Sequence, residues 1–185
     1  SYDMDASGID ATIISSQKGL AIPPGLSMIV VNERTYQKII GNTPSTLYFR
    51  LKDYFSNMQR GQTPFTPAQG IVYQLNAQLK KVTKSGINTF INRSASLAVD
   101  FRSKVAKFPF FVPPYKLSNT LTPIIIPSAN AYEIFLQLKN EFDIFVTPSG
   151  GDLKDKLLTV SHIGNLTLED NLMLVYALRK VVQKT

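Results

Sequence analysis

The sequence predicts an α/β fold in two parts, and three observations indicate it. The chain has 185 residues, of which 44% are hydrophobic and 18% charged, a composition typical of globular domains. Strand-like and helix-like apolar patterns alternate along it. Two long helical patterns then meet near residue 86, after which aromatic residues, prolines and short strands follow. We therefore expect residues 1–86 to be the end of a larger α/β domain, and residues 87–185, with a connecting helix, to form a small α/β domain.

The first part opens with two short apolar runs rich in β-branched residues, "DATIIS" (10–15) and "LSMIVVN" (26–32). They predict strands that are buried on both faces. Asn32 can cap a short helix over 33–40, which Gly41 and Pro44 would end. A further short helix is indicated by apolar residues at near-helical spacing, namely Leu47, Leu51, Phe55 and Met58.

Two prolines three residues apart in "RGQTPFTPAQG" prevent a regular helix or central strand there. Thr66 is suited to cap the helix that follows, with Pro67 at its first position. One face of this helix carries Val72, Leu75, Leu79 and Val82, and Gly86 is placed to end it. A second long helix has an apolar face made by Ile87, Phe90, Ile91, Ser94, Leu97, Phe101 and Val105.

The second part reads as strand (120–127), helix (129–142), strand (143–148), strand (156–162) and helix (167–184). Thr167 can cap the closing helix, and Glu169 and Asp170 suit its first turn because acidic side chains favour helix N-termini. A β-α-β-β-α order with short links predicts a small sheet covered by helices on one side.

Composition excludes several kinds of site. The chain has no cysteine and a single histidine, His162, so it offers no disulfide, thiolate nucleophile, cysteine metal site or histidine-rich metal site. Its net charge of +7 allows nucleic acid or an anionic ligand as a partner. The basic residues are spread along helical faces, however, as solvated faces usually are. No apolar run is long enough to span a membrane and no leader pattern opens the sequence, so we expect a cytoplasmic protein.

Lys18 is the residue that most needs an explanation, because it follows the strand at 10–15 and precedes a glycine and two prolines. A buried ammonium loses its hydration, and burial lowers its pKa, as the attack of a lysine on a carbonyl requires. The alternative is a lysine that points out of a surface turn. The spacing alone favours the surface turn.

The segment "SSQKGLAIPPGLSMIVVNE" resembles the lysine segment of the class V pyridoxal-phosphate-dependent aminotransferases, which include the alanine-glyoxylate, serine-pyruvate and 2-aminoethylphosphonate-pyruvate transaminases. Two further stretches, "RGQTPFTPA" and "KDKLLTVSHIGNLTLEDNLMLVYAL", are similar to the same family in the same order. The resemblance covers essentially the whole chain. It implies the C-terminal half of a fold-type-I enzyme: the end of the large mixed-sheet cofactor domain followed by a small α/β domain.

The resemblance also implies roles for single residues. Lys18 would bond to the aldehyde of pyridoxal 5'-phosphate and, once released by the amino substrate, carry a proton between the substrate and the cofactor. Gln17 would hydrogen-bond near the cofactor phosphate. Thr63 matches a threonine that reaches the phosphate in the neighbouring subunit, which implies a homodimer, and Arg60 could supply a second phosphate contact.

Two departures from the family pattern affect these expectations. Where the family commonly has an arginine that binds the substrate carboxylate, this sequence has Thr159, whose hydroxyl carries no charge. The histidine that follows, His162, is interpreted as a structural residue or as one that supports the site from behind, in preference to a catalytic base. The family's aspartate for the pyridine nitrogen and its stacking aromatic also lie well upstream of the lysine, so the missing N-terminal half of the cofactor domain becomes an expected partner of Lys18.

The sequence thus predicts part of an aminotransferase that moves an amino group from alanine, serine or 2-aminoethylphosphonate to pyruvate or glyoxylate. The 185-residue chain alone is expected to be inactive. A relative that performs β-elimination is a second possibility, although the lack of cysteine argues against a desulfurase. A degenerate member of the fold that acts as a non-catalytic or assembly partner is a third, and a basic nucleic-acid-binding module is the most distant.

Overall fold

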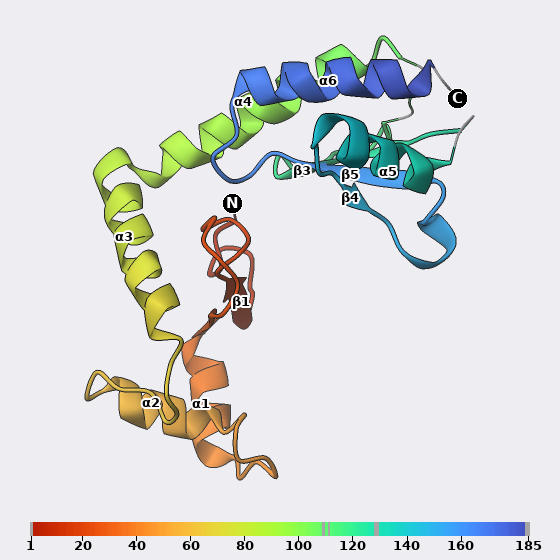
Figure 1. The fold of residues 1–185 in the computed structure, drawn as a ribbon. Coiled ribbons are helices and arrows are strands. Elements are labelled where there is room, and N and C mark those ends of the chain that lie inside the picture. The colour runs from red at the N-terminus through yellow and green to blue at the C-terminus, as the bar shows by residue number, and fades with distance from the viewer. Residues whose placement is uncertain (1, 109, 111, 128–129, 184–185) are drawn as a thin grey trace. The chain divides into compact units, whose positions relative to one another are not determined.

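The computed structural model describes residues 2–108, 110, 112–127 and 130–183 (Figure 1). The chain forms two compact units, Ser1–Lys84 and Ser85–Thr185. The division falls two residues before the boundary expected at 86/87. Each unit is described by itself.

The first unit combines a β-hairpin with three helices. Strands β1 (Ala11–Ser15) and β2 (Ser27–Val31) pair antiparallel, with Ala11 opposite Val31 and Ser15 opposite Ser27. Helices α1 (Glu33–Gly41), α2 (Leu51–Met58) and α3 (Gln69–Ser85) follow. Asn32 caps α1 as predicted, because its side-chain oxygen accepts a hydrogen bond from the Thr35 N–H at 3.0 Å.

The hairpin is not buried on both faces, so that prediction is wrong for this unit. Ile13 is 69% exposed, and Ile14, Ile29 and Val30 are exposed as well. The physical reason is that two strands alone provide one layer, and burial requires a second layer packed on each face. Among the described residues of this unit, Ser16 alone is buried.

Helix α3 begins later than predicted. Its first hydrogen bonds are accepted by the Ala68 carbonyl, from the N–H groups of Ile71 at 2.9 Å and Val72 at 3.0 Å. Thr66 and Pro67 therefore precede the helix and are neither its cap nor its first residue. Gly86 follows α3 with φ of +77°, a backbone conformation that glycine adopts without strain, and so ends the helix as expected.

The second unit contains a three-stranded antiparallel sheet in the order β3-β5-β4. Its elements are α4 (Ile87–Val105), β3 (Leu121–Ile125), α5 (Ala131–Phe142), β4 (Thr147–Pro148), a short 3₁₀ turn (Gly151–Leu153), β5 (Leu157–Ser161) and α6 (Leu168–Val182). Ala129, where the sequence pattern begins the α5 helix, lies outside the described residues. Strand β4 is shorter than predicted, because Asp143 takes a left-handed conformation (φ 55°) at the C-terminus of α5 and pairing starts only at Thr147.

The helices cover one face of this sheet, as predicted. Alternate residues of β3 and β5 are buried, namely Thr122, Ile124, Leu158 and Val160. Helix α5 packs on β4 and β5, α4 packs on β3, and α6 packs on α4 and α5 (Figure 1). The predicted face of α4 is buried at Leu97, Phe101 and Val105, whereas Ile87 is exposed. Each large apolar side chain buried here stabilises the unit by about 1.5–3 kcal/mol.

Helix α6 begins with the predicted cap. The Thr167 hydroxyl accepts from the Asp170 N–H at 3.3 Å, and the Asp170 carboxylate accepts from the Thr167 N–H at 2.7 Å. This reciprocal pair satisfies two N–H groups that a helix otherwise leaves without partners. The last helix of the second unit therefore has a well-defined N-terminus.

Candidate functional site: the Lys18 turn and the neighbouring cavity

The turn that carries Lys18 is closed at its base by Ser16. This side chain is fully buried; its hydroxyl donates to the Pro23 carbonyl at 2.8 Å and accepts from the Leu26 N–H at 3.3 Å. The Ser16 N–H also donates to the Leu26 carbonyl at 3.0 Å. These contacts join the two ends of the loop over residues 17–25. Sequence reasoning included Ser16 in a motif but did not recognise that it closes the loop.

Lys18 itself is exposed. Its backbone N–H donates to the Ser15 carbonyl at 3.3 Å, and its carbonyl accepts from the Ala21 N–H at 2.9 Å, so the main chain is fixed while the side chain extends from it. In the part of the chain that the structure describes, no hydrogen bond or ion pair to the Lys18 ammonium is found. The amine is therefore available to a ligand.

The loop returns to β2 through Gly25, which has φ of +146°. A side chain here would be strained, and its Cβ would lie 3.0 Å from Cγ1 of Ile71. Gly25 thus permits the close approach of the loop to helix α3.

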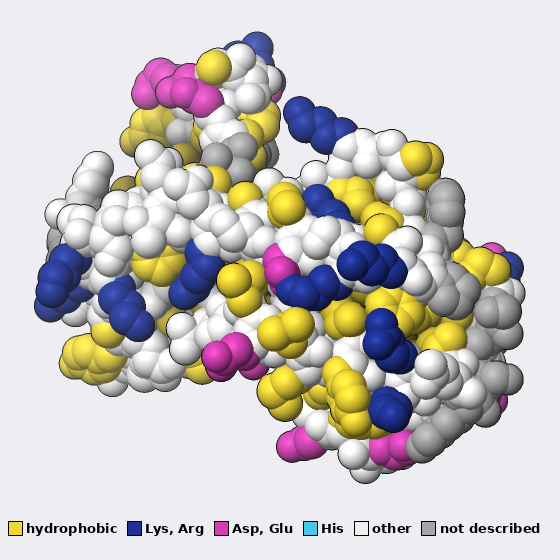
Figure 2. All heavy atoms as spheres, turned by 90° about the horizontal axis from the view of Figure 1, so that it is seen from above, with side chains coloured by type: hydrophobic (Ala, Val, Ile, Leu, Met, Phe, Trp, Pro, Cys, Tyr) yellow, Lys and Arg dark blue, Asp and Glu magenta, His cyan; other side chains and the backbone are white. Residues whose placement is uncertain are grey.

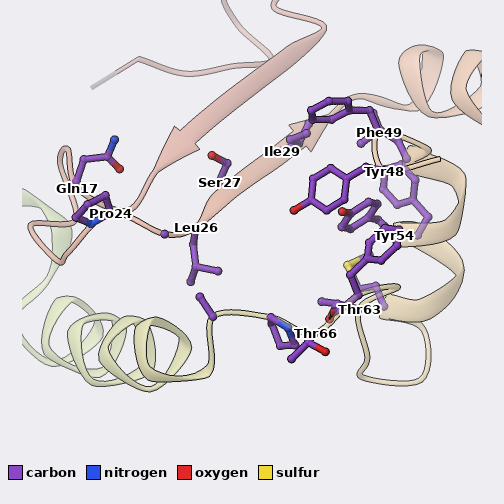
Figure 3. A pocket seen from close by; sticks show the side chains of 17 residues that line it. Gln17, Pro24, Leu26, Ser27, Ile29, Tyr48, Phe49, Tyr54, Thr63 and Thr66 are labelled. Atoms are coloured by element: carbon purple, nitrogen blue, oxygen red, sulfur yellow. Dashed lines mark hydrogen bonds between the residues drawn. The ribbon is translucent and has the colours of Figure 1, made fainter. Parts of the chain in front are cut away.

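A cavity of about 600 Å³ lies between this loop and the segment that contains α2 (Figure 3). Gln17, Pro24 and Leu26 line one side, and Tyr48 and Tyr54 lie across from Gln17 and Pro24. Thr63 and Thr66 also contribute to the wall. This volume lies within the range typical of small-molecule sites, roughly 300–1,000 Å³.

The cavity brings together two of the four residues expected at the cofactor, Gln17 and Thr63. Lys18 and Arg60 are not among the residues that line it. The Arg60 guanidinium instead donates to the Asn57 side-chain oxygen at 2.6 Å, and the Thr63 hydroxyl donates to the Phe65 carbonyl at 2.6 Å. Arg60 and Thr63 would have to give up these two hydrogen bonds in order to bind a phosphate.

Sequence reasoning missed the aromatic wall of the cavity. Tyr48 and Phe65 stack with ring centroids 5.0 Å apart, and the Tyr54 ring lies 6.4 Å from that of Phe65. Burial, assisted by the contact with Tyr48, raises the pKa of Tyr54, so its hydroxyl stays neutral and can donate. The aromatic pairs in "LYF" and "DYF", on either side of the start of α2, are the signal that could have indicated this wall.

These residues fit pyridoxal phosphate in their chemistry. Gln17, Thr63 and Thr66 can donate hydrogen bonds to phosphate oxygens, the aromatic rings offer a flat surface to a pyridine ring, and Lys18 supplies an amine on the loop that borders the cavity.

Thr159 lies in the second unit, at the centre of strand β5 between Pro123 and Thr147. It is half-buried and faces away from the helices, since its neighbours Leu158 and Val160 face them. The structure therefore puts this residue on the sheet surface that the unit's own helices do not cover.

His162 is a core residue, as interpreted from the sequence. It is 1% exposed, and its Nε2 lies 2.8 Å from Oγ1 of Thr122, which also accepts from the Arg102 guanidinium at 2.8 Å. Its Nδ1 finds no partner among the described residues. Burial, with the charge of Arg102, lowers the pKa of His162 to about 4, so the ring is neutral near pH 7.

The described residues contain no cluster of three potential metal ligands. None of the helices in the described ranges is both long and apolar enough to cross a membrane. On the face seen in Figure 2, Lys and Arg side chains are interspersed with hydrophobic, acidic and other side chains.

Comparison with known proteins places the sequence and the fold. The soluble hydrogenase 42 kDa subunit of Anabaena cylindrica is 27% identical over 97% of this chain and 47% of its own length. The L-aspartate–glyoxylate aminotransferase of Paracoccus denitrificans is 24% identical over 90% of the chain and 43% of its own length. The crystal structure of pyridoxamine-pyruvate aminotransferase from Mesorhizobium loti matches all of the chain and 49% of its own, with a TM-score of 0.90 and 21% identity.

The chain has the fold of a class V aminotransferase. The fold-type-I class predicted from the sequence is thus confirmed. The chain spans about half the length of the curated relatives it matches, as expected for the C-terminal half of such an aminotransferase. No protein-family model matches the sequence. Two of the relatives are named as hydrogenase subunits, and several others are named as aminotransferases.

Proposed function

We propose that this chain is the lysine-bearing part of a pyridoxal-phosphate-dependent aminotransferase that transfers an amino group from a small donor to pyruvate or glyoxylate. The observation that carries the proposal is that Gln17 and Thr63, far apart in the sequence, line one cavity beside the loop of Lys18. Relatives named as aminotransferases with glyoxylate as a substrate support the reaction class. Alanine, serine and 2-aminoethylphosphonate are the proposed donors.

Each residue has a task in this proposal. When bound, pyridoxal phosphate supplies an aldehyde and an electron-withdrawing ring. Lys18 holds the cofactor through Nζ, and after release the same amine accepts and returns the proton at the amine-bearing carbon. Gln17 and Thr63 donate to the phosphate, and Arg60 adds a cation once it leaves Asn57.

The loop suits Lys18 to this task. Its main chain is fixed by the Ser16 contacts and by Pro23 and Pro24, whereas its long side chain makes no described polar contact. Because the main chain is fixed, few conformations have to be ordered before reaction, and the long side chain still allows one amine to reach two atoms.

The complete enzyme requires groups beyond this chain. We propose a cytoplasmic homodimer, as the family resemblance implies. Because Thr63 lines the same cavity as Gln17 in one chain, we assign it to the phosphate of that chain's own cofactor and not to that of the partner. A polypeptide equivalent to the other half of the relatives would supply the group that faces the pyridine nitrogen. By itself the 185-residue chain is then inactive.

The test is the absorbance spectrum of the complete protein that contains this chain, with added pyridoxal phosphate. We expect a band near the visible edge from the lysine-bound cofactor, which Lys18→Ala abolishes. Lys80→Ala, at an exposed position of α3, is the matched control and keeps the band. No band, or a band unchanged in Lys18→Ala, would rule out the proposal.

A non-catalytic member of the fold is the second candidate, because Thr159 stands where the family has its carboxylate-binding arginine and because two relatives are named as hydrogenase subunits. With no cysteine, this chain can contribute no thiolate ligand to an iron–sulfur cluster. A complete protein that binds no cofactor but co-purifies with a second subunit would favour this candidate.

A further inference from the structure

The outer face of helix α6 carries apolar side chains that the second unit leaves uncovered. Leu168, Leu172, Met173 and Tyr176 are 51–60% exposed, whereas among the described residues α4 exposes two large apolar side chains and α5 none. Tyr176 follows Leu172 by four residues and Met173 by three, so these three share one side of the helix and we call them the α6 patch. Single exposed apolar residues are normal on a protein surface, but a contiguous group marks an interaction site.

Opposite charges stand at the two ends of the α6 patch. Glu169 precedes the patch by three residues, and Arg179 and Lys180 follow it by three and four, so all three share its side of the helix. They are exposed, and in the part of the chain that the structure describes none of them forms an ion pair. Arg179 lies over the Phe108 ring at 5.0 Å from its centroid. Lys180 lies over the Tyr176 ring at 5.6 Å.

Glu169 is the acidic group at this end that can meet a partner. The neighbouring Asp170 carboxylate is already used inside the helix cap, where it accepts from the N–H of Thr167 at 2.7 Å and from its hydroxyl at 2.9 Å. From its N-terminus to its C-terminus, the outer face of α6 is therefore acidic, apolar and then basic.

This order of charges is complementary to itself when two copies of the helix run antiparallel. Glu169 and Lys180 lie equally far from the point midway between Met173 and Tyr176, roughly 8 Å along the helix at 1.5 Å per residue. A two-fold axis at that point puts the acid of each copy opposite the cations of the other, and the two α6 patches against each other. A parallel pair would instead place like charges together, which is destabilising.

A partner with a purely acidic or purely basic surface fits this face less well, because it meets like charge at one end of the patch. We propose that the outer face of α6 binds the same face of a second copy of this chain, antiparallel around a two-fold axis. This inference does not rest on the proposed aminotransferase function. Each subunit of a homodimer presents its own α6, so the contact would join such dimers into larger assemblies.

The first experiment measures the mean mass of the complete protein by sedimentation velocity as its concentration rises. A single pair of helices buries less than the roughly 1,200 Å² of a stable interface, so we expect a weak association with a Kd of about 10–300 µM. Leu172→Gln should abolish the rise in mass across that range. Leu153→Gln is the matched control and should keep it, because Leu153 lies in the 3₁₀ turn and is 52% exposed, against 54% for Leu172. A mass that does not rise with concentration, or a rise that the two variants affect equally, overturns the inference.

The second experiment reverses the charges. Glu169→Lys, and separately the double change Arg179→Glu with Lys180→Glu, should each weaken the association by about tenfold, because attractive contacts become repulsive. An equal mixture of the two variants should associate as tightly as the parent, since each acid then faces a cation again. Asp152→Lys, at an exposed position of the 3₁₀ turn, makes the same charge change as Glu169→Lys and should have no effect.

The mixture distinguishes this contact from other occupants of the face. All of the substituted positions are exposed, so the variants should fold. If the mixture associates as weakly as its components, the helices do not pair antiparallel and the inference is wrong. If the α6 variants instead lose a second, different subunit, that subunit covers the face and the inference is equally wrong.

Discussion

Replacement of Ser16 by alanine tests whether this residue holds the Lys18 loop closed. The change removes the hydrogen bond donated to the Pro23 carbonyl and the one accepted from the Leu26 N–H, and both partly buried groups then lose a partner. At roughly 1 kcal/mol for each bond, the loop loses about 2 kcal/mol of local stability. The opening equilibrium should therefore rise about 30-fold.

The assay is hydrogen exchange of the peptide over residues 16–26 in the complete protein, because exchange reports local opening. Ser16→Ala should speed exchange of the Leu26 N–H by about 30-fold and slow or weaken formation of the lysine-bound cofactor band. Ser27→Ala is the control, since Ser27 is exposed and no hydrogen bond of its side chain is described. Equal exchange in the two variants would refute the view that Ser16 closes the loop.

Three further changes have defined outcomes. Gly25→Ala should destabilise the protein by about 1–3 kcal/mol in urea denaturation, because of its φ of +146° and the 3.0 Å approach to Ile71, whereas Gly19→Ala, with open space around it, should change stability little. Thr167→Ala should lower the free energy of unfolding by about 1 kcal/mol, because the helix cap is lost. An unchanged midpoint of urea denaturation would show that the cap does not stabilise the protein. As the pH falls from 6.5 to about 4, His162 binds a proton in the unfolded state but stays neutral in the folded state. The free energy of unfolding should therefore fall by up to about 1.4 kcal/mol per pH unit. His162→Gln should remove that slope between pH 6.5 and 5. Below about pH 5, Asp10 and Asp100, whose pKa values are lowered in the folded state, also begin to contribute, so an unchanged slope between pH 6.5 and 5 would contradict the assignment.

Local signals in the sequence predicted most elements because their causes are local. Asn32 and Thr167 cap helices through groups three residues away, and Gly86 ends α3 through its own backbone. The Thr66 prediction failed because several polar residues near Pro67 could serve as a cap, and only the hydrogen bonds show that Ala68 precedes the helix. Strand β4 was overestimated because Asp143 ends α5 in a left-handed conformation and pairing with β5 starts only at Thr147.

Burial and site geometry depend on distant residues, so the sequence could not determine them. The hairpin of β1 and β2 has the composition of a buried strand pair, yet Ile13 is exposed because no second layer covers it in this unit. The motif indicated Gln17 and Thr63 one by one, whereas their common cavity arises because the loop, α2 and the segment before α3 surround one space. The aromatic wall around Tyr48 and Phe65 is likewise a tertiary feature.

The central claim is that Lys18 is the residue that bonds to the cofactor. The most direct test is to treat the complete protein with pyridoxal phosphate, reduce the lysine–cofactor bond with borohydride, and locate the modified residue by peptide mass spectrometry. The account predicts a single major adduct on Lys18. An adduct confined to other lysines, or none at all, would contradict it.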